Sequence, residues 1–147
     1  MSIAIQYPAP DFKLTVDNGQ QKIWDDIRKI HVVLTPEEWV RQNFIAYLTR
    51  VLQYPQALIS VEKQIRVNNM AKRYDIVVYN RQHQPWMLVE CKAPEIPLSA
   101  NALLQAANYQ SVLHTGYMIW VNGPTVIGVQ TGAGAVLLHN LPAFPAL

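Results

Sequence analysis

Three charged residues in two nearby segments form a set that could carry chemistry. Asp75 lies in RYDIVVY, and Glu90 and Lys92 lie in the later segment LVECKAP. Two converging carboxylates suit a hard cation such as Mg²⁺, which is often held by only one or two protein carboxylates. A bound cation activates water and offsets charge on a phosphate, while a neighbouring lysine can orient or deprotonate the water. The set therefore has what metal-assisted phosphodiester hydrolysis requires.

The flanking residues place this set on two β-strands. Residues 73–79 and 86–91 are rich in β-branched, aromatic and other apolar side chains, and residues 80–85 between them favour a turn. The two strands are therefore expected to pair in antiparallel fashion. Asp75 and Glu90 then converge, provided that the register brings them to one face of the sheet.

Side chains alternate between the two faces of a strand, which separates the residues around Glu90. Glu90 and Lys92 are two positions apart and share a face at the end of the strand, whereas Cys91 points to the core together with Val89. The alternative for this set is an exposed cross-strand salt bridge between Lys92 and one acid. That pairing leaves the second acid without a role, so metal chemistry explains the set better.

The remaining elements predict a mixed central sheet covered by helices. The turn signal Asp17-Asn18-Gly19 between two alternating segments predicts an N-terminal β-hairpin. Proline residues after residue 92 prevent easy continuation of the strand. In chain order we expect strands at 12–16, 22–24 and 29–33, a helix at 35–52, strands at 61–67, 73–79 and 86–91, a helix at 99–113, and strands at 117–121, 125–130 and 135–139.

Glu38, near the start of the first helix, has two interpretations. The sequence Thr35-Pro36-Glu37-Glu38 has threonine at the N-cap, proline at the first helical position and glutamate at the third. This capping box alone would explain the glutamate. Glu38 also lies at the edge of an apolar stripe with Ile45, Leu48 and Leu52, where a carboxylate is costly unless it has a partner. Capping and a contribution to the site both stay open.

The motifs RYDIVVY and LVECKAP together resemble the PD-(D/E)xK nuclease superfamily, most closely the N-terminal nuclease domain of type I restriction enzyme R subunits. The resemblance runs from TPEEWVRQNF to beyond QAANYQ, over residues 35 to 130. It implies an α/β (α+β) fold with a restriction-endonuclease-like core of order αβββαβ. It also implies a Mg²⁺-dependent nuclease acting on DNA, with Mn²⁺ as a substitute. Tyr74 stands where the superfamily motif has proline, a position at which type I relatives commonly differ.

The resemblance implies a role for each residue of the central set. Asp75 and Glu90 would ligate the metal, and the backbone carbonyl of Cys91 would complete the site. Lys92 would act on the nucleophile. Glu38 matches the acidic residue of the first core helix, which supports the metal or its water.

Three further residues are candidates for positioning the site or contacting nucleic acid. Gln105 and Tyr109 match the QxxxY motif of the RecB-like branch and, at positions i and i+4, share one helical face. Their alternatives are a partly buried polar residue and a core tyrosine. Arg73 shares a strand face with Asp75, so it either contacts phosphate or balances the acids. Lys72 is expected to be solvated.

Length and composition set the outer limits of these predictions. A chain of 147 residues fits one domain, which we divide into an N-terminal β extension (1–34), the nuclease core (35–130) and a C-terminal strand and tail (131–147). A single cysteine, the lack of a signal peptide and the lack of a long apolar segment predict a cytoplasmic protein without membrane contact.

Charge is distributed unevenly along the chain. The net charge is +2, and no Asp, Glu, Lys or Arg follows Glu95. Electrostatic chemistry must therefore be built in the first two-thirds, and the uncharged last third predicts core strands with a surface for a protein partner or a second copy. Because the chain lacks a helicase motor, the second hypothesis is a nuclease fold that binds nucleic acid or a partner but cuts little alone. Activity on RNA or branched substrates is a third.

Overall fold

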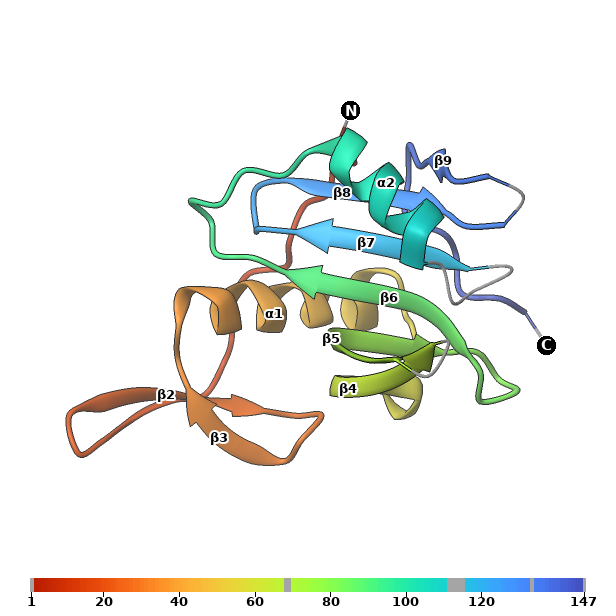
Figure 1. Ribbon diagram of the computed structural model, residues 1–147. Helices are drawn as coiled ribbons and strands as arrows, with labels where there is room; N and C mark the ends of the chain where they lie inside the picture. Colours follow the sequence, from red (N-terminus) through yellow and green to blue (C-terminus); the bar gives the residue numbers. More distant parts are fainter. Residues whose placement is uncertain (1, 68–69, 111–115, 133, 147) are drawn as a thin grey trace.

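The computed structural model describes residues 2–67, 70–110, 116–132 and 134–146, with the backbone alone at 67, 70, 109 and 110. Figure 1 shows how its sheets and helices are arranged. The elements are β1 (Leu14–Asp17), β2 (Gln20–Asp25), β3 (Ile30–Val33), α1 (Pro36–Ala46) with a π-helical turn (Tyr47–Val51), a 3₁₀ turn (Gln56–Leu58), β4 (Ile59–Val67), β5 (Met70–Tyr79), β6 (Pro85–Cys91), α2 (Ala100–Gln110), β7 (Tyr117–Val121), β8 (Val126–Gln130) and β9 (Val136–Leu137).

The central sheet is mixed, as predicted, with strand order β4-β5-β6-β7-β8-β9. Strands β6 and β7 are parallel and are joined through α2, whereas the other neighbouring pairs are antiparallel. Parallel neighbours need such a crossover connection. The element order from α1 to β7 is thus the expected αβββαβ core.

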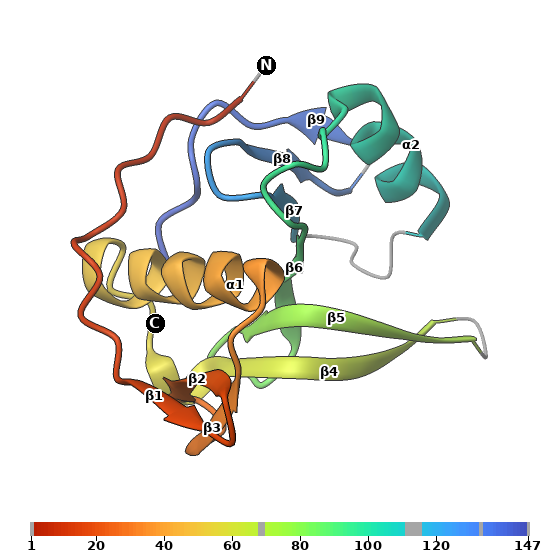
Figure 2. The ribbon, with the colours of Figure 1, turned by 90° about the vertical axis from the view of Figure 1, so that its left-hand side faces the viewer.

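The two helices cover opposite faces of this sheet, which gives the domain two core clusters (Figure 2). Val40 and Phe44 of α1, with Leu48 of the π-helical turn that follows it, pack with apolar residues of β5 to β8. On the other face Leu103 and Ala107 of α2 pack with Tyr74, Val77 and Leu88, among others. Each helix therefore fixes one side of the strands that carry the predicted site.

Local signals explain where the helices begin and end. The Thr35 hydroxyl accepts the backbone N–H of Glu38 at 3.0 Å, and Pro36 takes the first helical position, so α1 begins as predicted. Its predicted end at residue 52 is reached through the π-helical turn rather than through regular α-helix. For α2, the Ser99 hydroxyl accepts the N–H of Ala102 at 3.2 Å. The predicted continuation of this helix over 111–113 lies outside the described residues.

The N-terminal hairpin is one part of a separate three-stranded antiparallel sheet, β1-β2-β3, which also includes the short strand predicted at 29–33. At the other end of the chain, the strand predicted at 135–139 is reduced to β9, whose two residues pair with β8. The uncharged composition of β7 and β8 is explained by burial, because most of their residues are buried on both faces of the sheet. The predicted partner surface in this third stays a prediction.

A fork between β5 and β6 is the feature of the sheet that matters most for the site. The two strands pair from Tyr79 and Pro85 up to Ile76 and Val89. Beyond that point β5 continues alongside β4, while the end of β6 continues alongside β7. The β4–β5 hairpin therefore extends away from the rest of the sheet (Figure 2). Asp75 is the first residue of β5 on the open side of this fork.

Candidate active site

At the fork, Asp75 of β5 is held by β6, the strand from which β5 separates at this point. Its Oδ2 accepts the backbone N–H of Cys91 at 2.7 Å, so the carboxylate takes the place of a main-chain acceptor between the two strands. Its Oδ1 lies 3.4 Å from Nη2 of Arg41 on α1. The side chain is 23% exposed, which leaves it accessible from the open end of the fork.

A backbone irregularity turns Asp75 toward α1. Glu62, across the hairpin, has φ 54°, in the left-handed region that non-glycine residues rarely adopt, and the Glu62–Asp75 pair is missing from an otherwise continuous register. Side-chain alternation breaks at the same place. Tyr74 and Val77, three residues apart, pack in the same core cluster, whereas Ile76 packs in the other. Strained backbone of this kind is found preferentially at functional sites.

Glu90 and Lys92 lie close enough for their charges to act on Asp75. Burial raises the pKa of Asp75, the Cys91 N–H and the Arg41 charge lower it, the Glu90 charge raises it and the Lys92 charge lowers it, leaving the pKa above its ordinary value. The fork therefore brings the three predicted residues into one electrostatic unit. Lys92 itself is exposed at the end of β6, and its backbone N–H donates to the Val121 carbonyl of β7 at 2.8 Å.

The cation that pairs with Glu90 is Lys72, which the sequence analysis had expected to be solvated. Its Nζ lies 2.8 Å from Glu90 Oε1 and 5.1 Å from the centre of the Tyr74 ring. That expectation was wrong because the break in alternation brings this lysine of β5 across to the end of β6. The Glu90 charge also contributes, after burial, to raising the pKa of Tyr74 to about 12. Among the described residues Lys92 forms no ion pair with Asp75 or Glu90, so the alternative of an exposed salt bridge between Lys92 and one acid is not what the structure shows.

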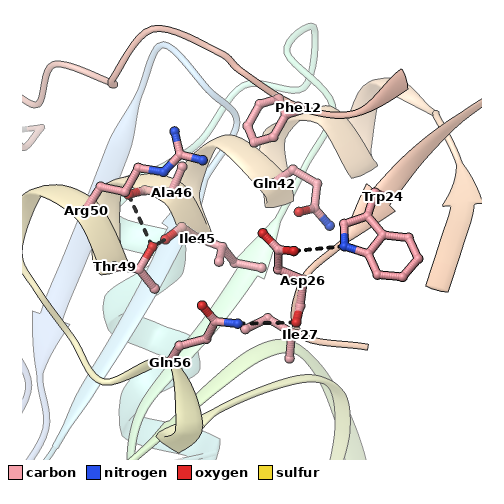
Figure 3. Close-up of a pocket in the computed structure, with 10 residues that line it drawn as sticks. All are labelled: Phe12, Trp24, Asp26, Ile27, Gln42, Ile45, Ala46, Thr49, Arg50 and Gln56. Carbon is pink, nitrogen blue, oxygen red and sulfur yellow. Dashed lines mark hydrogen bonds between the residues drawn. The ribbon is translucent and has the colours of Figure 1, made fainter. Parts of the chain in front are cut away.

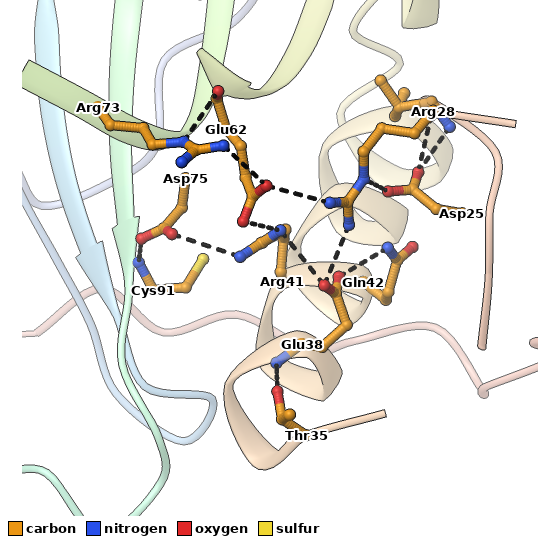
Figure 4. Close-up of polar contacts among 11 residues, drawn as sticks. Asp25, Arg28, Thr35, Glu38, Arg41, Gln42, Glu62, Arg73, Asp75 and Cys91 are labelled. Atoms are coloured by element: carbon orange, nitrogen blue, oxygen red, sulfur yellow. Dashed lines mark hydrogen bonds and ion pairs between the residues drawn. The ribbon is translucent and has the colours of Figure 1, made fainter. Parts of the chain in front are cut away.

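The capping box predicted for Glu38 forms only in part, because its backbone N–H takes part in the cap and its side chain does not. Thr35 accepts the Glu38 N–H, but the Glu38 carboxylate is engaged elsewhere. Its Oε1 lies 3.0 Å from Arg28 Nη2, and its Oε2 accepts from Gln42 Nε2 at 3.0 Å. The residue is only 7% exposed. The buried carboxylate thus has the partners that its position on α1 demands, and it points into the polar layer between α1 and the hairpin (Figure 4).

Two arginines that the sequence analysis did not single out connect this polar layer. Arg41 Nη1 lies 3.3 Å from Glu38 Oε1 and 3.6 Å from Glu62 Oε1, in addition to its contact with Asp75. Arg28, in the turn after β2, pairs with Asp25, with Glu38, and at 3.4 Å with Glu62 (Figure 4). The one sequence signal for Arg41 was its position three residues after Glu38, which places both on the same helical face.

Arg73 contacts an acid of the hairpin. Its Nη2 lies 3.3 Å from Glu62 Oε2, and its Nε donates to the Glu62 carbonyl at 3.4 Å. The side chain is 68% exposed, so the ion pair is weak. In this structure Arg73 balances the charge of one acid, Glu62, and its predicted contact with phosphate stays a prediction.

The predicted QxxxY pair lies on α2, which packs against β7, β8 and β9. Gln105 is exposed, and within the described part of the chain it has no hydrogen bond to Asp75, Glu90 or Lys92. The Tyr109 side chain lies outside the described residues. Their predicted positioning role therefore stays a prediction.

A cavity of about 290 Å³ lies between the N-terminal sheet and α1 (Figure 3). Its wall combines aromatic and polar side chains, including Phe12, Trp24, Asp26 and Gln42. The Trp24 indole N–H donates to Asp26 at 2.8 Å. Asp75, Glu90 and Lys92 do not line this cavity, so it is separate from the candidate site.

A family model described as the type I restriction enzyme R protein N terminus matches residues 36–145. This chain belongs to that family. No curated protein and no solved structure matches the chain. The match begins at Pro36, so the R protein N-terminal family covers Glu38, Arg41 and the whole central sheet but not the sheet that carries Arg28.

The donors of this R protein N-terminal domain fit a magnesium ion. Asp75 and Glu90 offer hard carboxylate oxygens, and each already faces a cation of the protein, Arg41 and Lys72 respectively. Among the described residues there is no group of three or more His, Cys, Asp or Glu arranged to hold a metal. Carboxylate oxygens are ligands of the kind that Mg²⁺ takes, and it is often held by one or two of them together with several waters. No helix in the described residues is long and apolar enough to cross a membrane.

Proposed function

We propose that this R protein N-terminal domain is a Mg²⁺-dependent nuclease that hydrolyses phosphodiester bonds of DNA, with Mn²⁺ as a substitute. The observation that carries the proposal is Asp75 at the strand fork, fixed by the Cys91 N–H and within the field of Glu90 and Lys92. Membership of the restriction enzyme R protein family supports the choice of DNA as substrate.

Each residue of the proposed site has a role that follows from its position. Asp75 and Glu90 hold the cation, with the Cys91 carbonyl as the predicted third protein ligand. When bound, Mg²⁺ supplies Lewis-acid polarisation of the phosphate and activation of water. Lys92 is anchored by its backbone to β7 while its side chain is exposed, which leaves the ammonium able to orient the attacking water or meet charge on the phosphate. Glu38 supports this arrangement through Arg41.

Cleavage assays with neutral, isosteric variants test the proposal. Asp75→Asn, Glu90→Gln and Lys92→Met should each lower Mg²⁺-dependent cleavage of DNA by at least about a hundredfold, because each removes a charge that acts on the transition state. Asp17→Asn is the matched control, since Asp17 is an exposed acid on β1 that pairs with Lys22. Circular dichroism and thermal melting should show that the variants are folded.

The substrates should include linear, circular and single-stranded DNA and RNA, with Mg²⁺ and with Mn²⁺. Preferential cleavage of RNA would reassign the substrate. Equal cleavage by wild type and the three site variants would refute the proposed site. Absence of cleavage by the wild type, together with salt-dependent DNA binding, would instead establish a nuclease fold that binds nucleic acid and relies on a partner for activity.

A further inference from the structure

Arg41 occupies an unusual position for a cation. It is 5% exposed and lies among three carboxylates from three different elements: Glu38 of α1, Glu62 of β4 and Asp75 of β5. Two of its buried nitrogen atoms, Nε and Nη1, have no hydrogen-bond partner. The guanidinium is therefore held by charge more than by directed hydrogen bonds.

The distances support this description. The three nitrogen–oxygen separations are 3.3, 3.6 and 3.4 Å, longer than the 2.7–2.9 Å of a strong charge-assisted hydrogen bond. An arginine cannot lose its charge in a protein, so this buried cation always needs anionic partners. With three carboxylates in reach, it can give up one and still keep two.

The contact between Arg41 and Asp75 involves the carboxylate that the predicted metal needs. Oδ2 of Asp75 already accepts the Cys91 N–H, so Oδ1, which faces Arg41, is the oxygen that has more capacity for a cation. The guanidinium and a divalent ion cannot both occupy the immediate neighbourhood of Oδ1 without strong repulsion.

We propose that Arg41 is a built-in counter-ion of Asp75, which the divalent cation displaces when it binds. This inference rests on the proposed function. In the absence of metal, Arg41 compensates the charge of the half-buried Asp75. When Mg²⁺ binds, the guanidinium is released from Oδ1 and stays with Glu38 and Glu62. Arg41 is thus a positioning residue that sets the metal affinity.

The direction in which the Mg²⁺ affinity changes when Arg41 is replaced distinguishes a competing counter-ion from a purely structural residue. If Arg41 competes with the metal, replacing it with methionine raises Mg²⁺ affinity, by about tenfold for the loss of one partly screened repulsion. If Arg41 only holds Asp75 in a binding-competent orientation, the same replacement lowers the affinity. Arg41→Lys keeps the charge and should bind Mg²⁺ within about threefold of wild type.

The test is calorimetric titration of the full chain with Mg²⁺ alone, without nucleic acid. Arg28→Met is the matched control, because Arg28 belongs to the same ion network and pairs with Glu38 and Glu62 but has no ion pair with Asp75. We expect tighter binding for Arg41→Met, little change for Arg28→Met, and a larger Mg²⁺-dependent rise in melting temperature for Arg41→Met than for wild type. Equal or weaker binding by Arg41→Met, or an equal gain in both variants, overturns the inference.

A second measurement needs no destabilising change. In ¹⁵N spectra of the wild type, the Arg41 Nε resonance should shift on Mg²⁺ addition, while that of Arg28 stays in place. The Arg41 resonance is assigned by its loss in Arg41→Lys. An unmoved Arg41 resonance at saturating Mg²⁺ overturns the inference. If no Mg²⁺ binds to the wild type, both this inference and the proposed function fail. If Mg²⁺ binds with the predicted pattern but DNA is not cut, only the proposed function fails.

Discussion

Asp25 is predicted to be a large single contributor to stability, although it lies outside the central sheet. Its side chain is fully buried, and its carboxylate accepts the backbone N–H groups of Ile27 at 2.8 Å and of Arg28 at 3.2 Å. It also forms an ion pair with the Arg28 guanidinium. One acid thus closes the turn after β2 and holds the arginine that links the N-terminal sheet to Glu38.

The cost of Asp25→Ala follows from these three interactions. Hydrogen bonds to a charged group contribute about 1.5–3 kcal/mol each, and removing one member of a buried ion pair costs about 3–5 kcal/mol in all. Because the interactions share one carboxylate they are not additive, so we expect a total loss of about 3–5 kcal/mol. For a domain of this size that corresponds to a fall in melting temperature of roughly 10–15 °C.

The variant Asp25→Asn separates the contribution of the turn hydrogen bonds to stability from that of the ion pair. The amide oxygen can still accept the two backbone N–H groups, while the ion pair is lost and Arg28 keeps Glu38 and Glu62 as partners. We expect a loss of about 1–2 kcal/mol. Urea denaturation followed by circular dichroism measures both values. A loss below about 1 kcal/mol for Asp25→Ala, or equal losses for the two variants, would refute the reasoning.

Two further predictions concern buried positions of the central sheet. Burial, followed by the Asp75 charge, raises the pKa of Cys91 well above its ordinary value. At pH 8 a thiol reagent should therefore react at least about a hundredfold more slowly with the native protein than with the protein in urea. Reaction rates within tenfold of each other would contradict this prediction. Gly128→Ala should cost about 1–3 kcal/mol, because its new Cβ would lie 2.7 Å from Ile119 Cδ1 and 3.1 Å from Leu138 Cδ1; an unchanged urea midpoint would show that these side chains repack freely.

Much of the fold was predictable because its signals are local. The cap at Thr35, the turn at Asp17-Asn18-Gly19 and the alternating strands each depend on residues within one element. The proximity of Asp75 to Glu90 was also predictable, since a short turn between two strands fixes their pairing. The short β9 and the π-helical end of α1 were not, because tertiary contacts rather than local preference decide where such elements stop.

The partners of the acids were harder to predict for a physical reason. Strict alternation places Lys92 on the same strand face as Glu90. The positive φ of Glu62 and the break in alternation at Asp75 move the preceding side chains of β5 to the other face of the sheet. Lys72 therefore becomes the ion-pair partner of Glu90. Arg41 and Asp75 are 34 residues apart, and they meet where β5 parts from β6 and Asp75 faces α1. No periodic pattern in the sequence encodes such a division.

The concentration of charge in the first 95 residues now has a structural explanation. The acids of the site are matched by cations from four separate elements: the turn after β2, α1, β5 and the end of β6. In the proposed function, a divalent ion would enter a site whose negative charge is already compensated, and its binding would favour withdrawal of a protein cation. Lys72, which is 37% exposed, would have solvent to withdraw into, whereas the buried Arg41 would keep Glu38 and Glu62 as its partners. The proposal thus gives Glu38 and Glu62 a role near the site without contact between either of them and the metal.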